Sequence, residues 1–144
     1  MATQVQVVLD CADPDRLARF WSEALGYQLQ DPPAGYPTWE DFLRDIGVPP
    51  DDWNAASALV DPTGRGPRIY LQRVTEPKSG KNRMHLDLNV GGGVDVPAEQ
   101  RRENVAAEVS RLAALGATQV REHTERGEYW VIMQDPEGNE FCVQ

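Results

Sequence analysis

The strongest constraint on how this 144-residue chain folds is an internal repeat. Each half reads as strand, helix, Leu-Gly, two strands, an Asp-Pro-x-Gly turn and a final strand. In the first half the strands are expected at residues 5–10, 27–30, 56–60 and 68–74, with the helix starting at Pro14. In the second half they are expected at residues 84–90, 118–121, 129–133 and 140–144, with the helix after Pro97. The shared order predicts an α+β fold built from two tandem βαβββ units.

The helix boundaries carry the clearest local signals. Asp13 is a good N-cap residue, Pro14 suits the first helical position, and glycine follows each helix. Apolar residues recur at helical spacing in both helices. They are Leu17, Phe20, Trp21 and Leu25 in the first helix, and Val105, Val109, Leu112 and Leu115 in the second.

An insertion at residues 31–52 interrupts the first unit and is Pro-rich at both ends. Thr38 is a helix start signal, and apolar residues follow it at helical spacing. The simpler interpretation is a surface helix packed on its own sheet. The alternative is a lid that carries Trp39 over a pocket, because long inserted loops are often functional.

Composition excludes several classes of function. A net charge of −9 argues against nucleic-acid binding, and no apolar run approaches the roughly 20 residues of a membrane span. The first residues show no secretion signal, so a cytoplasmic location is expected. Cys11 and Cys142 suggest neither a disulfide framework nor a zinc motif. Gly91-Gly92-Gly93 lacks the spacing of a phosphate-binding loop and indicates a flexible connection.

Basic residues concentrate in one stretch of this acidic chain. The simpler interpretation is a solvated linker, and the alternative is a rim that attracts an anionic ligand. The residues concerned are Arg68, Arg73, Lys78, Lys81 and Arg83.

Four segments resemble the glyoxalase-like branch of the vicinal-oxygen-chelate (glyoxalase / bleomycin resistance / extradiol dioxygenase) superfamily. They are residues 13–21, 24–27, 81–88 and 135–141. The resemblance spans nearly the whole chain outside the insertion. It implies one domain over residues 1–144, with unit one at about 4–75, the insertion at 31–52 and unit two at about 82–144. It also implies a cupped, mostly antiparallel sheet around a cavity, and a homodimer.

The resemblance also implies where a metal would bind. The family's two histidines and its terminal glutamate fall on Gln6, His85 and Cys142, and a fourth position falls near Tyr70 or Gln72. Such ligands suit Ni, Zn, Mn, Co or Fe. Only His85 is a strong ligand here. Glu140 shares a strand face with Cys142 and is the substitute carboxylate, so we expect a degenerate metal site.

Two functions follow from this pattern. The first is binding of a small organic ligand in the cavity without a full metal site. The alternative is a metal-dependent lyase, isomerase or dioxygenase anchored on His85. Between them lies metal-independent chemistry, with His85 as a general base oriented by Asp87; both residues could equally be satisfied wall residues.

The remaining candidate residues are expected in the wall of the cavity or outside it. The expected ligand contacts are Gln6, Gln72, Trp39, Trp130 and Cys142. His123, among charged residues after a predicted strand, is expected in a solvated turn.

Overall fold

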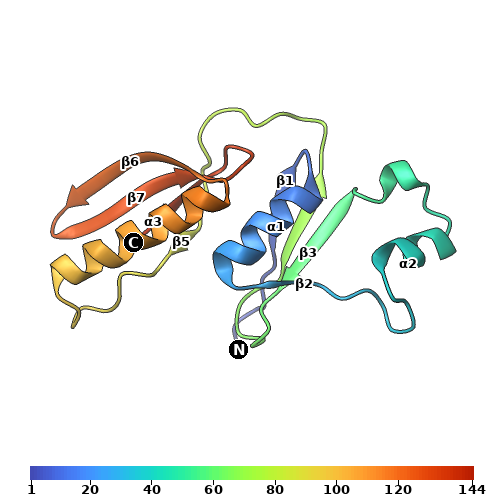
Figure 1. Cartoon of the computed structure of the whole chain (residues 1–144), viewed down its shortest axis with the longest axis horizontal. Coiled ribbons are helices and arrows are strands. Elements are labelled where there is room, and N and C mark those ends of the chain that lie inside the picture. Colours follow the sequence, from blue (N-terminus) through green and yellow to red (C-terminus); the bar gives the residue numbers. More distant parts are fainter. The chain divides into compact units, whose positions relative to one another are not determined.

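The computed structural model describes all 144 residues, and the chain divides into two compact units, Met1–Pro77 and Lys78–Gln144. Unit 1 holds seven elements: β1 (Val7–Cys11), α1 (Pro14–Leu25), β2 (Gln28–Leu29), α2 (Trp39–Asp45), the 3₁₀ helix η1 (Pro50–Asp52), β3 (Ala56–Val60) and β4 (Ile69–Arg73). Unit 2 holds five: β5 (Asp87–Leu88), α3 (Ala98–Leu115), β6 (Thr118–Glu125), β7 (Glu128–Gln134) and β8 (Glu140–Val143) (Figure 1).

The two units have the same sheet topology. The strand order is β1-β4-β3-β2 in unit 1 and β5-β8-β7-β6 in unit 2. In each sheet the first and last strands of the unit pair in parallel, and the other two pairings are antiparallel. The predicted α+β class with two tandem βαβββ units is therefore confirmed.

Helix α1 covers β3 and β4 because its apolar stripe faces them. Leu17, Phe20 and Trp21 are buried, and the Asp13 side chain accepts a hydrogen bond from the Arg16 amide at the start of the helix. Gly26 ends the helix with φ of 68°, a left-handed conformation that glycine adopts without strain. The predicted helix and both of its boundaries are confirmed.

Helix α3 covers one face of the unit 2 sheet through Val105, Val109 and Leu112. Leu115, the fourth residue of the predicted stripe, is 37% exposed. It lies in the last turn of the helix, directly before Gly116, where the chain turns away toward β6. The stripe therefore ends one turn earlier than the sequence predicts.

The insertion forms α2 and η1, and the helix start predicted at Thr38 is confirmed. Thr38 Oγ1 accepts a hydrogen bond from the Asp41 amide at 3.1 Å, and none of the α2 residues is buried. Trp39 Nε1 donates to the Gln30 carbonyl at 2.8 Å, which ties α2 to the segment after β2.

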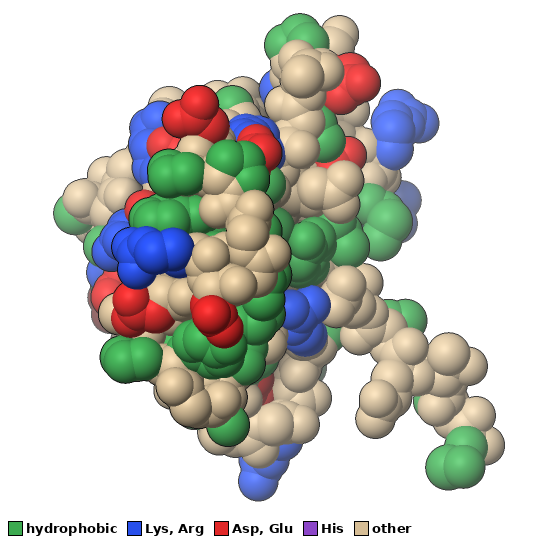
Figure 2. Space-filling model, turned by 90° about the vertical axis from the view of Figure 1, so that its right-hand side faces the viewer, with side chains coloured by type: hydrophobic (Ala, Val, Ile, Leu, Met, Phe, Trp, Pro, Cys, Tyr) green, Lys and Arg blue, Asp and Glu red, His purple; other side chains and the backbone are tan.

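Figure 2 shows that hydrophobic side chains and charges of both signs are interspersed on one face of the molecule.

Two strand predictions for unit 2 need correction. The strand expected at 84–90 is only Asp87–Leu88, because it pairs with β8 at these two residues alone. His123 was expected in a turn but lies within β6. The hairpin turn comes later, at Arg126 and Gly127, where φ is 51° and 79°. Positive φ at both turn residues matches the twist of an antiparallel pair, so the charged segment stays extended up to the turn.

No helix of the structure has both the length and the apolar character needed to cross a bilayer.

Candidate functional site

The candidate site is a pocket on the unit 2 sheet. Alternate residues of β7 and β8, such as Val131, Met133 and Val143, are buried on the face that α3 covers. Trp130, Ile132 and Cys142 alternate with them and line a pocket of about 430 Å³. The polar residues of its wall are Lys81, His85, Asp87, Glu128, Glu140 and Gln144. The volume lies within the range of about 300–1,000 Å³ that is usual for small-molecule sites.

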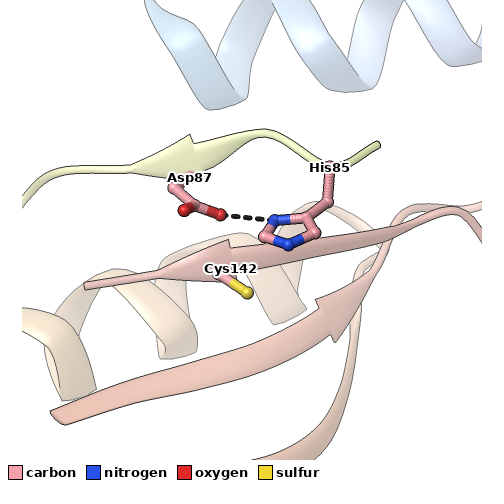
Figure 3. A group of neighbouring side chains, drawn as sticks. All are labelled: His85, Asp87 and Cys142. Atoms are coloured by element: carbon pink, nitrogen blue, oxygen red, sulfur yellow. Dashed lines mark hydrogen bonds and ion pairs between the residues drawn. The ribbon is translucent and has the colours of Figure 1, made fainter. Parts of the chain in front are cut away.

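His85 and Asp87 form the closest polar pair in the pocket. His85 Nδ1 lies 2.6 Å from Asp87 Oδ1, and the two side chains are 39% and 38% exposed (Figure 3). A carboxylate only accepts hydrogen bonds, so the proton of a neutral imidazole lies on Nδ1. The Nε2 atom then carries a lone pair, as a hydrogen-bond acceptor or general base requires.

Cys142 is held beside this pair by the parallel β5–β8 register, which sets it opposite Asp87. The ligand atoms of His85, Asp87 and Cys142 all lie within 4.8 Å of one another. Burial raises the pKa of the Cys142 thiol, and the charge of Asp87 and a hydrogen bond to it act in the same direction, against a smaller lowering by Lys81. Without a bound metal, Cys142 is therefore a thiol near neutral pH.

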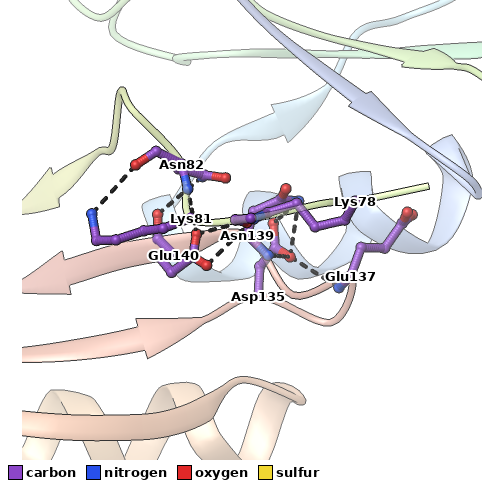
Figure 4. Close-up of polar contacts among 8 residues, drawn as sticks. Lys78, Lys81, Asn82, Asp135, Glu137, Asn139 and Glu140 are labelled. Carbon is purple, nitrogen blue, oxygen red and sulfur yellow. Dashed lines mark hydrogen bonds and ion pairs between the residues drawn. The ribbon is translucent and has the colours of Figure 1, made fainter. Parts of the chain in front are cut away.

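Glu140, the predicted substitute ligand, is engaged with the segment before β5. Its Oε2 accepts a hydrogen bond from the Asn82 amide at 2.9 Å and lies 3.3 Å from Lys78 Nζ (Figure 4). Burial raises the pKa of Glu140, but the hydrogen bond from Asn82 and the neighbouring ammonium of Lys78 outweigh it, so the pKa is lowered. This carboxylate fixes the edge of the pocket.

The predicted site residues of unit 1 are neutral groups. Gln6 Oε1 accepts a hydrogen bond from Arg68 Nη1 at 2.8 Å, so this amide oxygen is already engaged. The unit 1 register pairs Val8 with Tyr70, as Asp87 pairs with Cys142 in unit 2. The uncertain fourth position of the repeat therefore falls on Tyr70. Gln72 lies two residues further along β4 and is exposed.

These donors do not fit the two histidines and one glutamate of the family's metal centre. The positions carry an engaged amide, one histidine and one cysteine; of the two nearby carboxylates, Asp87 is hydrogen-bonded to His85, and Glu140 is bound by Asn82 and Lys78. Imidazole and carboxylate are the donors that hold such divalent ions. The side chains of the pocket are therefore the groups available for binding or catalysis.

The two predicted tryptophan contacts lie in different surroundings. Trp39 belongs to α2 in unit 1 and is 38% exposed. Trp130 lines the pocket of unit 2, and its ring lies 5.1 Å from that of His123, at an angle of 14° between the planes. The sequence did not predict that His123 would lie beside Trp130. The Arg126-Gly127 pair could have indicated it, because a two-residue turn at these positions sets His123 directly across from Trp130.

Three cations of the basic stretch have polar partners within their own unit. Arg73 pairs with Asp52 at 3.2 Å, and Lys78 pairs with Glu140. Arg68 donates to Gln6 and to Gln30. Lys81 of the same stretch lines the pocket of unit 2.

Two tandem βαβββ units, each with its first and last strands paired in parallel, define the vicinal-oxygen-chelate class of proteins. Within that class the chain belongs to the glyoxalase-like domain family, whose model matches residues 6–144. No curated protein matches the chain at a significant level.

Solved structures of this class are similar to the chain over almost its whole length. A glyoxalase/bleomycin resistance protein/dioxygenase family enzyme from Burkholderia phytofirmans has a TM-score of 0.64 at 18% identity, covering 99% of this chain and 97% of that one. A structure described as a possible glyoxalase from Bacillus cereus has a TM-score of 0.61 at 15% identity, covering 100% and 99%.

A third similar protein was solved with a metal and an organic ligand. A mutant of the fosfomycin resistance protein FosX from Listeria monocytogenes, complexed with Mn(II) and 1S,2S-dihydroxypropylphosphonic acid, has a TM-score of 0.60 at 11% identity, covering 100% of this chain and 90% of that one. At these identities the likeness establishes the fold alone.

Proposed function

We propose that this protein binds a small organic ligand in the pocket of unit 2 without a full metal site. The observation that carries the proposal is the His85–Asp87 pair, 2.6 Å apart in the wall of a pocket of about 430 Å³. A few oriented polar groups in a partly apolar concave site are typical of ligand pockets. His85 is the central polar contact, and Asp87 orients its ring.

One observation favours metal-independent binding. An engaged amide oxygen, that of Gln6, and a cysteine replace a histidine and a glutamate at the family ligand positions. The hydrogen bond from Nδ1 to Asp87 leaves Nε2 of His85 available, and that atom can meet an organic ligand or a metal ion. If the ligand is also a substrate, His85 is the residue to act as general base.

Thermal unfolding of chelator-treated protein with a library of small organic compounds tests the proposal. A compound at about 100 times its dissociation constant stabilises the fold by about 2.7 kcal/mol. We expect stabilising compounds whose effect is lost in His85→Gln and reduced in Asp87→Asn. The matched control is Asp95→Asn, which removes an exposed carboxylate outside the pocket lining. Compounds that stabilise only when a divalent metal is restored would contradict the proposal.

One observation favours the alternative of a metal-dependent lyase, isomerase or dioxygenase. His85, Asp87 and Cys142 present nitrogen, oxygen and sulfur donors within 4.8 Å of one another. This set differs from the family pattern and includes a donor that suits soft metals. Titration with Co²⁺ under reducing conditions separates the two functions, because a thiolate bound to cobalt gives a near-ultraviolet charge-transfer band. A band that disappears in Cys142→Ser would favour the metal-dependent function.

We further propose that residues 1–144 form one domain, cupped around a cavity, and that the protein is a homodimer. Membership of the glyoxalase-like family supports this arrangement, and sheet edges at β2 and β6 give association a physical motive. Light scattering coupled to gel filtration should give about twice the 16.1 kDa of one chain. A monomer mass would refute the dimer. Separate unfolding transitions for the two units would refute the single domain. A cytoplasmic location stays a prediction from the sequence.

A further inference from the structure

We propose that the ligand of this pocket is a neutral, planar aromatic compound with a hydroxyl group, of the phenol or naphthol class. Its ring stacks on Trp130, and its hydroxyl donates a hydrogen bond to Nε2 of His85. This inference rests on the proposed function, because it names the ligand class for the same pocket.

The hydrogen bond between His85 and Asp87 favours a ligand that donates a hydrogen bond to His85. Its Nδ1 is held 2.6 Å from a carboxylate oxygen of Asp87, and that oxygen can only accept. When the ring carries one proton, that proton lies on Nδ1 and the Nε2 atom is an acceptor. A ligand carbonyl or ether oxygen would place one lone pair against another, whereas a hydroxyl supplies the missing proton.

The orientation of Trp130 selects a planar ring. His123 on β6 stacks against one face of the indole, with the rings 5.1 Å apart and at 14°. Since the two residues are cross-strand partners, the stacking direction runs across the sheet. On the other side of β7 from β6, Cys142 and Gln144 of β8 line the same pocket as Trp130. A flat ligand ring can continue this stack in an offset arrangement.

The charges of the wall select a neutral ligand. Asp87, Glu128 and Glu140 contribute three carboxylates, while Lys81 is the one cationic side chain in the lining. Lys78 lies near Glu140 and offsets part of its charge. An anionic ligand would meet a surplus of negative charge, so the pocket disfavours carboxylate and phosphonate compounds.

Calorimetric titration with matched naphthalenes tests this inference. At neutral pH we expect 2-naphthol to bind about tenfold more tightly than 2-methoxynaphthalene, which has nearly the same shape but no donor. Addition of a carboxylate, as in 6-hydroxy-2-naphthoate, should weaken binding. His85→Phe should remove the preference for 2-naphthol while binding of the ether persists, and Trp130→Leu should weaken both compounds.

The matched control is Tyr129→Leu, which removes an aromatic ring from the neighbouring residue of β7 outside this pocket and should leave both affinities unchanged. Equal binding of naphthol and its ether to the native protein would overturn the inference. If both naphthalenes fail while the compound library yields His85-dependent aliphatic ligands, the inference is wrong and the proposed function stands. If no compound binds in a His85-dependent way, both are wrong.

Discussion

Asp87 Oδ1 lies 2.6 Å from Nδ1 of His85, two residues earlier in the chain. Residues two apart in an extended segment project to the same side, so this contact is set by local geometry within unit 2. The pair fixes both the orientation and the tautomer of the only histidine at a family ligand position. The Asp87 carboxylate also raises the pKa of the neighbouring Cys142 thiol.

The thiol of Cys142 should react with iodoacetamide only at high pH. The thiolate is the reactive form, and burial together with the charge of Asp87 raises the Cys142 pKa above its ordinary value of 9.0. The rate, followed by mass spectrometry of the Cys142 peptide, should rise at a higher pH than for a free thiol. Asp87→Asn should move this rise to lower pH, while Asp95→Asn should not. An unchanged profile in Asp87→Asn would show that the carboxylate does not act on the thiol.

Glu140→Gln should lower the free energy of unfolding at pH 7 by about 1–2 kcal/mol, because a charged acceptor for the Asn82 amide is lost. The folded-state pKa of Glu140 lies below its ordinary value of 4.5. Its stabilisation is therefore present above that value and is lost as the pH falls through the lowered pKa. Urea denaturation at pH 7 and at about pH 3 should show the difference between mutant and native protein shrinking. Glu125→Gln, an exposed change on β6, is the control; an equal loss at both pH values would contradict the assignment.

Asp135→Ala should destabilise the protein by about 2–4 kcal/mol. Asp135 is 3% exposed, and its Oδ1 accepts hydrogen bonds from the amides of Glu137 and Asn139 and from the Asn139 side chain. Asp61 occupies the same turn in unit 1 but is more exposed, so Asp61→Ala should cost less. Chemical denaturation of the two variants checks the order, and the reverse order would contradict it.

Leu112→Ala should destabilise the protein by about 2–4 kcal/mol, whereas Leu115→Ala should cost under about 1 kcal/mol. Leu112 is fully buried under the unit 2 sheet, and Leu115 is 37% exposed. Both changes remove the same atoms from the same helix, so thermal unfolding of the pair isolates the effect of burial. Similar losses would mean that the stripe extends to the end of α3.

The sequence predicted the repeat, the helix boundaries and the paired Asp-Pro-x-Gly turns, because each depends on local chemistry at a few positions. It overestimated β5, which pairs with β8 at two positions only, Asp87 with Cys142 and Leu88 with Val143. The strand predicted at 118–121 was also too short, because charged residues such as Glu122 and Glu125 are typical of a loop. In β6 they lie on an exposed edge strand, where charged side chains are common.

The part of the candidate site that the sequence predicted is the part whose strand alignment followed from the internal repeat. His85, Asp87 and Cys142 were expected on one face, and the structure brings their ligand atoms together. The Asn82 and Lys78 contacts of Glu140 could not be predicted, because they join residues about 60 positions apart in the chain. The stack of His123 on Trp130 was missed because it depends on where a two-residue turn falls.

The placement of β4 and β8 inside their sheets has a consequence for synthesis on the ribosome. Each is the last strand of its unit, yet each lies between two others. Unit 1 has all its strands once Arg73 has left the exit tunnel, so its core can close while unit 2 is still being translated. In unit 2, β5 has no partner until β8 emerges, and β7 pairs only with β6 until then. In unit 1, β1 likewise has no partner until β4 emerges, so each nascent unit leaves its sheet incomplete until its last strand is out, and unit 1 reaches that point earlier.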